Sequence, residues 1–355
     1  MPPLSKDEFK RYNRQIILSE IGLEGQQKLK SAHVLMIGAG GLGCPVLQYL
    51  AAAGVGNIGI VDDDSVDESN LQRQILYNSA DLGLNKAEIA AKKISLLNPH
   101  IQIKAFPFRI NQDNCAKMIS NYDLIVDGSD NFATRYLVND CCVKLGKILV
   151  FGSIFKFEGQ VSVFNFNGGP TLRCIYPEAP LAHEVPNCSE IGVLGVLPGI
   201  IGLYMASEVL KVILNIGDVL SGKLLVINSL DNTHNVFKFK RTVPEGIAHL
   251  SKQPVLDKIT ADDNEILWEE YLANPENYFL VDVRESWEHE DENIGGINIS
   301  YNEVTDHLDQ LLTQKNILFY CETGQRSKVA VTLLKQISFM GNIFTLQCGI
   351  QNISQ

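Results

Sequence analysis

The residues of this 355-residue chain that are best suited to chemistry fall into two groups. The first group, within residues 38–131, combines glycines with arginine, lysine and carboxylate side chains. Such a set suits phosphate binding and the stabilisation of growing negative charge. The second group, at residues 321–327, is a short loop that begins with a cysteine, whose thiolate would be a nucleophile.

The glycines form the pattern GAGGLG at residues 38–43, directly after an apolar run and before residues with helical spacing. Backbone without side chains lets a phosphate approach the amide groups at a helix N-terminus. Asp62 follows at the end of the next expected strand, where a carboxylate can accept hydrogen bonds from ribose. A tight turn without ligand, or a dehydrogenase, would show the same pattern. The glycines predicted to bind nucleotide are Gly38, Gly40, Gly41 and Gly43.

Three charged residues favour a triphosphate site over a dehydrogenase. Arg73 lies in the sequence SNLQRQ, Lys86 in GLNK, and Asp130 at the end of DLIVDGSD. Cleavage of a triphosphate creates negative charge that two cations and a Mg²⁺-holding carboxylate neutralise. Each residue alone could be a solvated surface charge, but their combined order favours a site. Ser69, Asn70 and Asn131 are polar neighbours included in this predicted site.

Cys321 opens the sequence CETGQRS, which follows the apolar run NILFY and precedes an expected helix. Backbone amides in such a loop and the N-terminus of the helix both stabilise an anion. Together with Arg326 they favour the thiolate, and a persulfide on Cys321 would place its charge in the same environment. The alternative is a buried, unreactive thiol.

The elements that must position these residues alternate between strand and helix. Apolar runs predict strands at 33–38, 57–64, 101–108, 123–130 and 147–154. Helical spacing predicts helices at 45–55, 86–99, 112–120 and 133–146. Alternating residues at 157–166 and 223–241 suggest antiparallel strands beside them. The fold class is therefore α/β, a Rossmann-like, mostly parallel sheet with helices on both faces.

A second, smaller α/β pattern follows a proline-containing linker. The expected division is a first domain at 1–241, a linker at 242–255 and a second domain at 256–355. The second domain's expected elements are a helix at 259–275, strands at 278–285 and 316–324, and a helix at 327–339. Charge supports the division, because 24 basic and 24 acidic residues precede residue 256 while 6 basic and 17 acidic residues follow. The net charge of −11 argues against a general nucleic-acid binder.

The apolar stretch at 191–214 imitates a membrane span. It contains Glu208 and Lys211, a proline and four glycines, so we interpret it as a buried core helix and expect no membrane association. The polar N-terminus lacks the apolar segment of a secretory signal, which predicts a cytoplasmic, reducing location. Four cysteines are expected to serve packing there: Cys44, Cys115, Cys141 and Cys142.

Five motifs, RYNRQIIL, GAGGLGC, SNLQRQ, NK and DGSDN, resemble in this order those of the MoeB/ThiF adenylyltransferases, bacterial relatives of ubiquitin-activating enzymes. The resemblance extends over roughly residues 8–241. It implies ATP as cofactor, Mg²⁺ held by Asp130, and a homodimer in which Arg14 reaches into the neighbouring subunit's site. The implied reaction is adenylation of the terminal glycine of a ubiquitin-like sulfur carrier that ends in Gly-Gly. The implied ATP contacts are Gly41, Asp62, Asn70, Arg73, Lys86 and Asp130.

The sequence departs from this family at a structural zinc site. Where the family has two C-x-x-C pairs, this chain reads TLRC at 171–174 and TVPEGIA near 242–248. A closed zinc site needs four ligands, so we expect no zinc and interpret Cys174 as a remaining buried thiol. Cys188, in the polar sequence VPNCSE, matches the family's loop cysteine, which is proposed to form a thioester or an acyl disulfide with the carrier. An ordinary loop cysteine is the alternative.

The cysteine loop, together with LVDVRE at 280–285, resembles a rhodanese domain over roughly residues 256–350. The resemblance implies a persulfide on Cys321 and structural roles for Asp282 and Arg284. Glu322 places negative charge where many rhodaneses carry a basic residue, which disfavours small anionic donors such as thiosulfate.

These features predict adenylation followed by attack of the Cys321 persulfide, which yields a thiocarboxylate on the carrier, with Cys188 resolving the intermediate. A cysteine desulfurase or another persulfide donor would load Cys321, and Cys348 could be a second redox thiol. Molybdopterin, thiamine and tRNA-thiolation pathways all use similar partners, so the pathway stays open. The alternatives are an NAD-dependent oxidoreductase and a non-catalytic sulfur-relay scaffold.

Overall fold

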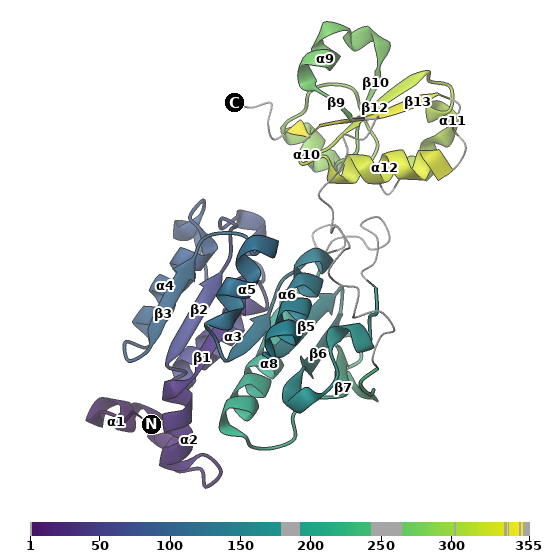
Figure 1. Ribbon diagram of the computed structural model, residues 1–355. Coiled ribbons are helices and arrows are strands. Elements are labelled where there is room, and N and C mark those ends of the chain that lie inside the picture. The colour runs from purple at the N-terminus through teal and green to yellow at the C-terminus, as the bar shows by residue number, and fades with distance from the viewer. Residues whose placement is uncertain are drawn as a thin grey trace. The chain divides into compact units, whose positions relative to one another are not determined.

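The computed structural model describes residues 2–178, 192–242, 265–301, 303–336, 339, 341–347 and 349–350. The chain divides into two compact units, Met1–Ala248 and His249–Gln355, and each is described on its own (Figure 1). Cys188 and Cys348 lie outside the described residues, so the predictions made for these two cysteines lie outside them as well. The expected linker also lies outside them, apart from Thr242.

The first unit is built on an eight-stranded sheet in the order β3-β2-β1-β4-β5-β6-β7-β8. Strands β1 to β5 pair in parallel and β6 to β8 pair antiparallel. The strands are β1 His33–Ile37, β2 Asn57–Val61, β3 Gln102–Phe106, β4 Leu124–Asp127, β5 Ile148–Phe155, β6 Glu158–Phe164, β7 Lys223–Asn228 and β8 Thr233–Lys238. The chain leaves β1 toward β2 on one side and has β4 on the other, so a crevice opens at the carboxyl ends of β1 and β4.

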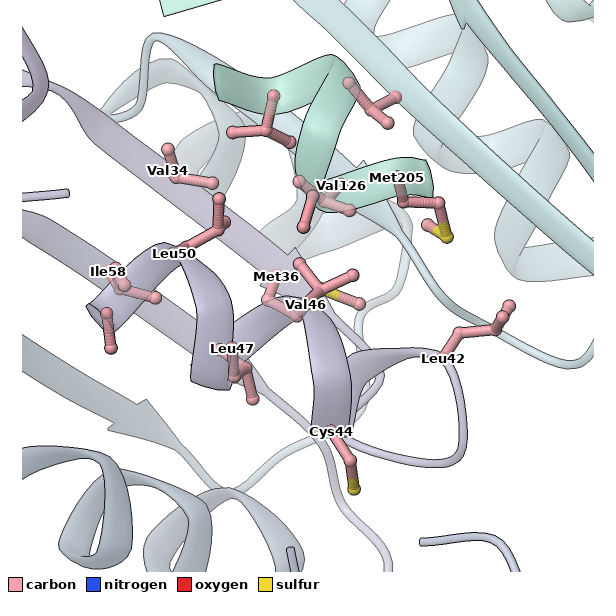
Figure 2. Close-up of a cluster of buried hydrophobic side chains, with 14 of the residues drawn as sticks. Val34, Met36, Leu42, Cys44, Val46, Leu47, Leu50, Ile58, Val126 and Met205 are labelled. Carbon is pink, nitrogen blue, oxygen red and sulfur yellow. The ribbon is translucent and has the colours of Figure 1, made fainter. Parts of the chain in front are cut away.

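Helices cover both faces of this sheet (Figure 1). The covering helices are α3 Gly43–Ala53, α4 Lys86–Leu97, α5 Gln112–Ser120, α6 Phe132–Leu145 and α8 Leu197–Leu214. Helices α1 Lys6–Ile16 and α2 Gly22–Ser31 pack on each other at one end of the sheet, and α2 also packs on α8 (Figure 1). Strand alternation assigns the faces: Val34 and Met36 of β1 join the core beneath α3, α4 and α8 (Figure 2), whereas Leu35 and Ile37 join the core beneath α5 and α6. The expected parallel sheet with helices on both faces is confirmed.

Helix α8 is the apolar stretch that imitates a membrane span. Within the described residues it is the one helix long and apolar enough to cross a membrane, and half of its apolar window is buried. It packs on α3, β5 and β6, and a Cβ at Gly202 would lie 2.5 Å from Pro45 Cγ of α3. This close packing fits the predicted core helix.

The second unit has a five-stranded parallel sheet in the order β11-β10-β12-β13-β9. Its strands are β9 Glu265–Ile266, β10 Phe279–Asp282, β11 Ile297–Asn298, β12 Asn316–Tyr320 and β13 Asn342–Leu346. Its α-helices are α9 Trp268–Ala273, α10 Ser286–Asp291, α11 Leu308–Leu311 and α12 Gln325–Gln336. Hydrophobic clusters lie on both faces of this sheet as well.

The expected long helix at 259–275 is wrong within the described residues. Ile266 instead lies in β9, which pairs with β13 and buries its side chain, and only the six residues of α9 are helical. A long-range pairing with Leu346 therefore overrides the local helical spacing. Sequence patterns also missed α1, α2, α10, α11, β11 and β13.

Candidate active site

The glycine pattern forms the turn between β1 and α3. Gly38 has φ +85°, and a Cβ there would lie 2.8 Å from the carbonyl oxygen of Gly128 in the β4–α6 turn. A Cβ at Gly43 would lie 2.2 Å from Gly38 O, and one at Gly41 would lie 3.0 Å from Pro198 Cβ of α8. Absence of side chains therefore lets β1, the β4–α6 turn and two helices approach closely, and leaves bare backbone at the crevice.

Asp62 braces this turn from the end of β2. Its carboxylate accepts hydrogen bonds from the backbone N–H of Ala39 at 2.7 Å and of Asp64 at 2.9 Å. Burial nevertheless raises the pKa of Asp62 to about 6. The hydroxyl of Tyr77 lies 2.8 Å from the carbonyl oxygen of Ala39 and holds the same turn. Asp62 thus has a structural role in addition to the predicted contact with ribose.

Lys86 is the first residue of α4 and is 95% buried. Its ammonium group lies 3.0 Å from a carboxylate oxygen of Asp64, whose side chain is largely exposed. The sequence analysis had not singled out Asp64, although the run of three aspartates after β2 was a signal for it. One carboxylate oxygen from each of Asp62, Asp63 and Asp64 lies within 4.8 Å of the other two. Lys86 therefore faces a strongly acidic strand end.

Arg73 and its neighbours form a turn beside the glycines. Arg73 Nη1 donates to the carbonyl oxygen of Ser69 at 2.9 Å, and the Ser69 backbone and hydroxyl donate to Asp67. Two amide oxygens here, Asn70 Oδ1 and Gln74 Oε1, are buried without a hydrogen-bond partner among the described residues. Such orphaned acceptors suit a site that expects donors from a bound molecule.

These residues converge on one pocket of about 290 Å³ at the carboxyl ends of the parallel strands. The predicted residues that line it are Gly38, Gly40, Gly41, Asp62, Arg73, Lys86, Asp130 and Asn131. Four predicted residues do not line it: Arg14, Gly43, Ser69 and Asn70. Polar residues that the sequence analysis missed also line it: Asp63, Asp64, Gln74, Arg109, Ser129, Thr134 and Arg135. Gln74 is the last residue of the SNLQRQ motif, whereas Arg109 and Arg135 had no local signal.

The β4–α6 turn carries the carboxylates of the opposite wall. Asp127, at the end of β4, is fully buried, which raises its pKa, and its Oδ1 accepts from the backbone and hydroxyl of Ser129 at 3.0 and 2.6 Å. Asp130 is exposed, and among the described residues its carboxylate has one hydrogen-bond partner, the Asn131 side-chain amide at 3.4 Å. Asp130 thus offers carboxylate oxygens to a metal ion, which fits the predicted Mg²⁺ site in its chemistry.

Arg14 lies exposed on α1, with no hydrogen bond or ion pair among the described residues. It does not line the pocket of its own chain. Its predicted reach into a second subunit therefore stays a prediction, as does the predicted homodimer.

The four cysteines expected to serve packing lie in the helices that cover the sheet. Cys44, Cys115 and Cys142 are buried, and Cys141 is half-buried. Burial raises the pKa of Cys44 to about 12, which leaves its thiol protonated and unreactive at neutral pH.

Cys174 joins two segments at the place where the zinc ligands of the resembled family are expected. Its sulfur accepts from the backbone N–H of Thr171 at 3.4 Å and donates to the carbonyl oxygen of Thr242 at 3.4 Å. Arg173 adds a bidentate ion pair with Asp140 of α6, at 2.8 and 2.7 Å. Cys174 is half-buried rather than fully buried as expected, and hydrogen bonds hold this region together.

In the second unit, Cys321 directly follows β12 and is 1% exposed. Its sulfur lies 3.8 Å from the hydroxyl oxygen of Ser327 in the first turn of α12. Ser327 in turn hydrogen-bonds to the carbonyl oxygen of Gly324 and to the hydroxyl of Thr345. The Ser327 hydroxyl therefore lies beside the sulfur, which the fold holds beneath the surface, while the predicted contact of backbone amides with the sulfur stays a prediction.

Arg326 is held by Glu288 of α10 through two hydrogen bonds of 2.6 and 2.7 Å. The hydrogen bond to Glu288 raises the pKa of Arg326, so its charge is permanent, but the carboxylate balances it. Arg284 likewise pairs with Asp282, at 2.8 Å, and with Glu322, at 3.3 Å. The arginines that flank Cys321 are thus both neutralised by carboxylates.

Comparison with known proteins gives two family matches. Residues 12–245 match the ThiF family and residues 267–355 match the rhodanese-like domain. The chain is 50% identical over 242 residues to the sulfur carrier protein adenylyltransferase of Thermus thermophilus, which covers 67% of this chain and 89% of that protein. It is 40% identical over 368 residues to the probable adenylyltransferase/sulfurtransferase MoeZ of Mycobacterium tuberculosis, over 98% of this chain and 93% of that protein.

A further relative is the adenylyltransferase and sulfurtransferase MOCS3 of Aedes aegypti, 39% identical over 94% of this chain and 83% of that protein. Among solved structures, Escherichia coli MccB with ATP is similar in fold, with a TM-score of 0.58 and 22% identity over 68% of this chain and 74% of that chain.

Proposed function

Because the chain belongs to the ThiF family and joins an adenylyltransferase domain to a rhodanese-like sulfurtransferase domain, we propose that it activates a ubiquitin-like sulfur carrier with ATP and then delivers sulfur to it. The observation that carries the adenylation step is the convergence of Arg73, Lys86 and the glycine turn on one pocket. A dehydrogenase needs no such pair of cations beside its glycine turn, and the relatives named above favour adenylation.

In the first step, an oxygen of the carrier's terminal carboxylate bonds to the α-phosphorus of ATP. The bond from that phosphorus to the bridging oxygen breaks, and pyrophosphate leaves with the electron pair. Carboxylate and triphosphate repel each other, so Arg73 and Lys86 lower the barrier by neutralising charge at the phosphates. The bare backbone at Gly38, Gly40 and Gly41 lets the phosphates approach the amides at the start of α3.

Mg²⁺ fits the pocket because Asp130 offers free carboxylate oxygens there. When bound, the ion would supply further positive charge to the leaving pyrophosphate. We expect no zinc, because Cys174 is the single cysteine at the two places where the family has C-x-x-C pairs.

In the second step, the terminal sulfur of a Cys321 persulfide attacks the acyl carbon of the adenylate, and AMP leaves. The product is an acyl disulfide between the carrier and Cys321. The Cys188 thiolate then attacks the Cys321 sulfur, the sulfur–sulfur bond breaks, and the thiocarboxylate leaves with the electron pair. A cellular thiol reductant must afterwards reduce the Cys188–Cys321 disulfide. A covalent link between the domains raises the local concentration of the persulfide at the adenylate.

The proposed partners are a carrier that ends in Gly-Gly, a cysteine desulfurase or another persulfide donor, and a second copy of the chain. The carrier belongs to a molybdopterin, thiamine or tRNA-thiolation pathway. We propose that the reaction takes place in the reducing cytoplasm, where both thiols stay available. The neutralised arginines beside Cys321 favour a protein donor over thiosulfate.

The test uses the full chain with MgATP and purified carriers that end in Gly-Gly. Pyrophosphate release that requires the carrier supports adenylation, and its absence with every carrier would refute that step. A persulfide source is then added, and intact-mass analysis follows the replacement of one carrier oxygen by sulfur. Cys321→Ala should abolish this replacement while pyrophosphate release persists. Thiocarboxylate formation by Cys321→Ala with a protein donor would contradict the delivery role.

A further inference from the structure

Arg135 is a buried cation that lines the adenylation pocket and that the proposed mechanism does not use. It lies in the first turn of α6 and is 7% exposed. Its Nη2 donates to the carbonyl oxygen of Ser129 at 2.9 Å, and its Nη1 donates to the hydroxyl of Ser153 in β5 at 3.0 Å. Both partners are neutral, so the charge of the guanidinium is not compensated by its hydrogen bonds.

The buried Asp127 is close enough to interact electrostatically with Arg135, but burial raises the pKa of Asp127 and favours its neutral form. The described residues show no ion pair to Arg135, and its Nε has no hydrogen-bond partner there. Instead, the rings of Phe132 and Phe151 lie 5.6 and 5.3 Å from the guanidinium carbon. The nearby Asp127 directs one oxygen to Ser129, and its other oxygen has no partner among the same residues. A buried guanidinium without a paired anion is costly, because arginine stays protonated.

An anion in the pocket would compensate that charge, and both carboxylates and phosphates match the fork of N–H groups on arginine. We propose that Arg135 binds the C-terminal carboxylate of the peptide tail before adenylation. The proposal rests on the proposed function and assigns a substrate-binding residue to it.

The position of Arg135 in the sheet favours a carboxylate over a phosphate. On one side of the crevice, the glycine turn follows β1 and Asp62 follows β2. Lys86 lies on the same side, at the start of α4. Arg135 follows β4 and bonds to β5, on the other side, because β1 lies between β2 and β4. Ile154 of β5 and Val193 line the pocket with it, and a glycine tail without side chains suits such a narrow, partly apolar wall. ATP on the glycine turn and Lys86 would thus leave the β5 side of the pocket to the tail.

The probe is a synthetic decapeptide that ends in Gly-Gly, prepared as the free acid and as the carboxamide. Binding of each to the full chain is measured by isothermal titration calorimetry with a non-hydrolysable ATP analogue present. The unmodified chain should prefer the acid by about tenfold, the order expected for a charge-assisted contact. Arg135→Met should bind the acid and the carboxamide with affinities that differ by no more than about twofold. Arg135→Lys keeps the charge but loses the fork, so its preference for the acid should lie between those of the unmodified chain and Arg135→Met.

Lys144→Met, on the exposed last turn of the same helix, is the matched control and should keep the acid preference. Circular dichroism verifies that each variant is folded. If Arg135→Met does not fold, the acid preference of Arg135→Lys decides the test. The proposal is overturned if the unmodified chain shows no acid preference, if Arg135→Met keeps it, or if that variant instead weakens only ATP binding. Carrier-dependent pyrophosphate release by the unmodified chain tests the proposed function separately.

Discussion

Two regions of the molecule differ in whether their polar and charged side chains have partners. Around the pocket of the first unit, Asn70, Gln74, Asp127 and Arg135 keep buried donors or acceptors without partners among the described residues. Around Cys321 in the second unit, the arginines are paired with carboxylates in the range 2.6–3.3 Å. The first region therefore has polar atoms that a bound ligand could pair, while the arginines of the second region already have carboxylate partners.

The difference follows from what each site must bind. Three of these orphaned atoms are acceptor oxygens and one is the Arg135 Nε donor. The proposed nucleotide and tail would supply partners, so the free-energy cost of leaving the atoms unpaired would persist only in the empty state. A covalently attached sulfur needs no free charged groups, and a paired loop holds one geometry. Removing charge should thus mainly reduce activity in the first unit and mainly reduce stability in the second.

The largest effect is expected from Asp282, which is fully buried and pairs with Arg284 and His289. Asp282→Asn removes the buried partner of Arg284 and leaves the longer, 3.3 Å contact with the more exposed Glu322, so the free energy of unfolding of the second unit should fall by about 3–5 kcal/mol. Urea unfolding followed by the fluorescence of Trp268 and Trp287 measures this. Asp291→Asn, at the exposed end of α10, is the control and should change stability little. Equal loss in both variants would argue against the paired network.

The pair also predicts a dependence on pH. Burial opposes ionisation of Asp282, but hydrogen bonds from Arg284 and His289 lower its pKa below the usual value. The folded state therefore binds fewer protons than the unfolded state, and this contribution to stability is present above about pH 4. It should be lost as the pH falls through the lowered pKa, and Asp282→Asn should remove that acid-dependent part of the unfolding curve.

Lys86 is expected to affect activity more than stability. Lys86→Met removes a buried cation from the pocket, so carrier-dependent pyrophosphate release should fall by about 10²–10³-fold, as for loss of one charge-stabilising group. Its partner Asp64 is largely exposed and can be solvated, which limits the loss of stability. Lys92→Met, on the exposed face of the same helix, is the matched control. If both variants retained full activity, Lys86 would have no role in the reaction.

A smaller effect concerns Asp62, whose pKa burial raises to about 6. A carboxylate accepts hydrogen bonds from ribose better when it is ionised, so adenosine affinity should rise about tenfold as the pH passes through 6. Adenosine is the suitable probe because it has no phosphate that titrates in this range. Asp62→Asn should flatten the profile, and so should 2′,3′-dideoxyadenosine with the unmodified chain. A flat profile with adenosine itself would contradict the ribose contact.

Local patterns were enough to predict much of the first region. The glycine turn joins β1 to α3, Asp62 follows the end of β2, and Lys86 begins α4. Such ends of strands and helices can be predicted from hydrophobic spacing. Arg135 was not predicted, because its role depends on its burial between Phe132 and Phe151, which no local pattern indicates. In the second unit, the Glu288–Arg326 pair joins residues 38 positions apart, and sequence spacing alone does not bring them together.

The expected helix at 259–275 failed for a related reason. Two residues of it, Glu265 and Ile266, pair with β13, about 80 positions later in the chain. Helix spacing is a local signal, whereas strand pairing depends on a partner that is not visible in the window. The strand pairing is favoured over the helix because it buries Ile266 in the core of the second unit.

The smallest predicted effect tests whether Cys174 holds its region without metal. Cys174→Ala removes contacts to Thr171 and Thr242 and should lower the free energy of unfolding of the first unit by about 1 kcal/mol. Cys174→Ser keeps a donor and an acceptor and should recover part of that loss. Treatment with a chelator should leave the melting temperature unchanged, because Arg173 and Asp140 supply a metal-independent link to α6. Stoichiometric zinc in the purified protein, released together with a loss of stability, would show that cysteines beyond Cys174 complete a site.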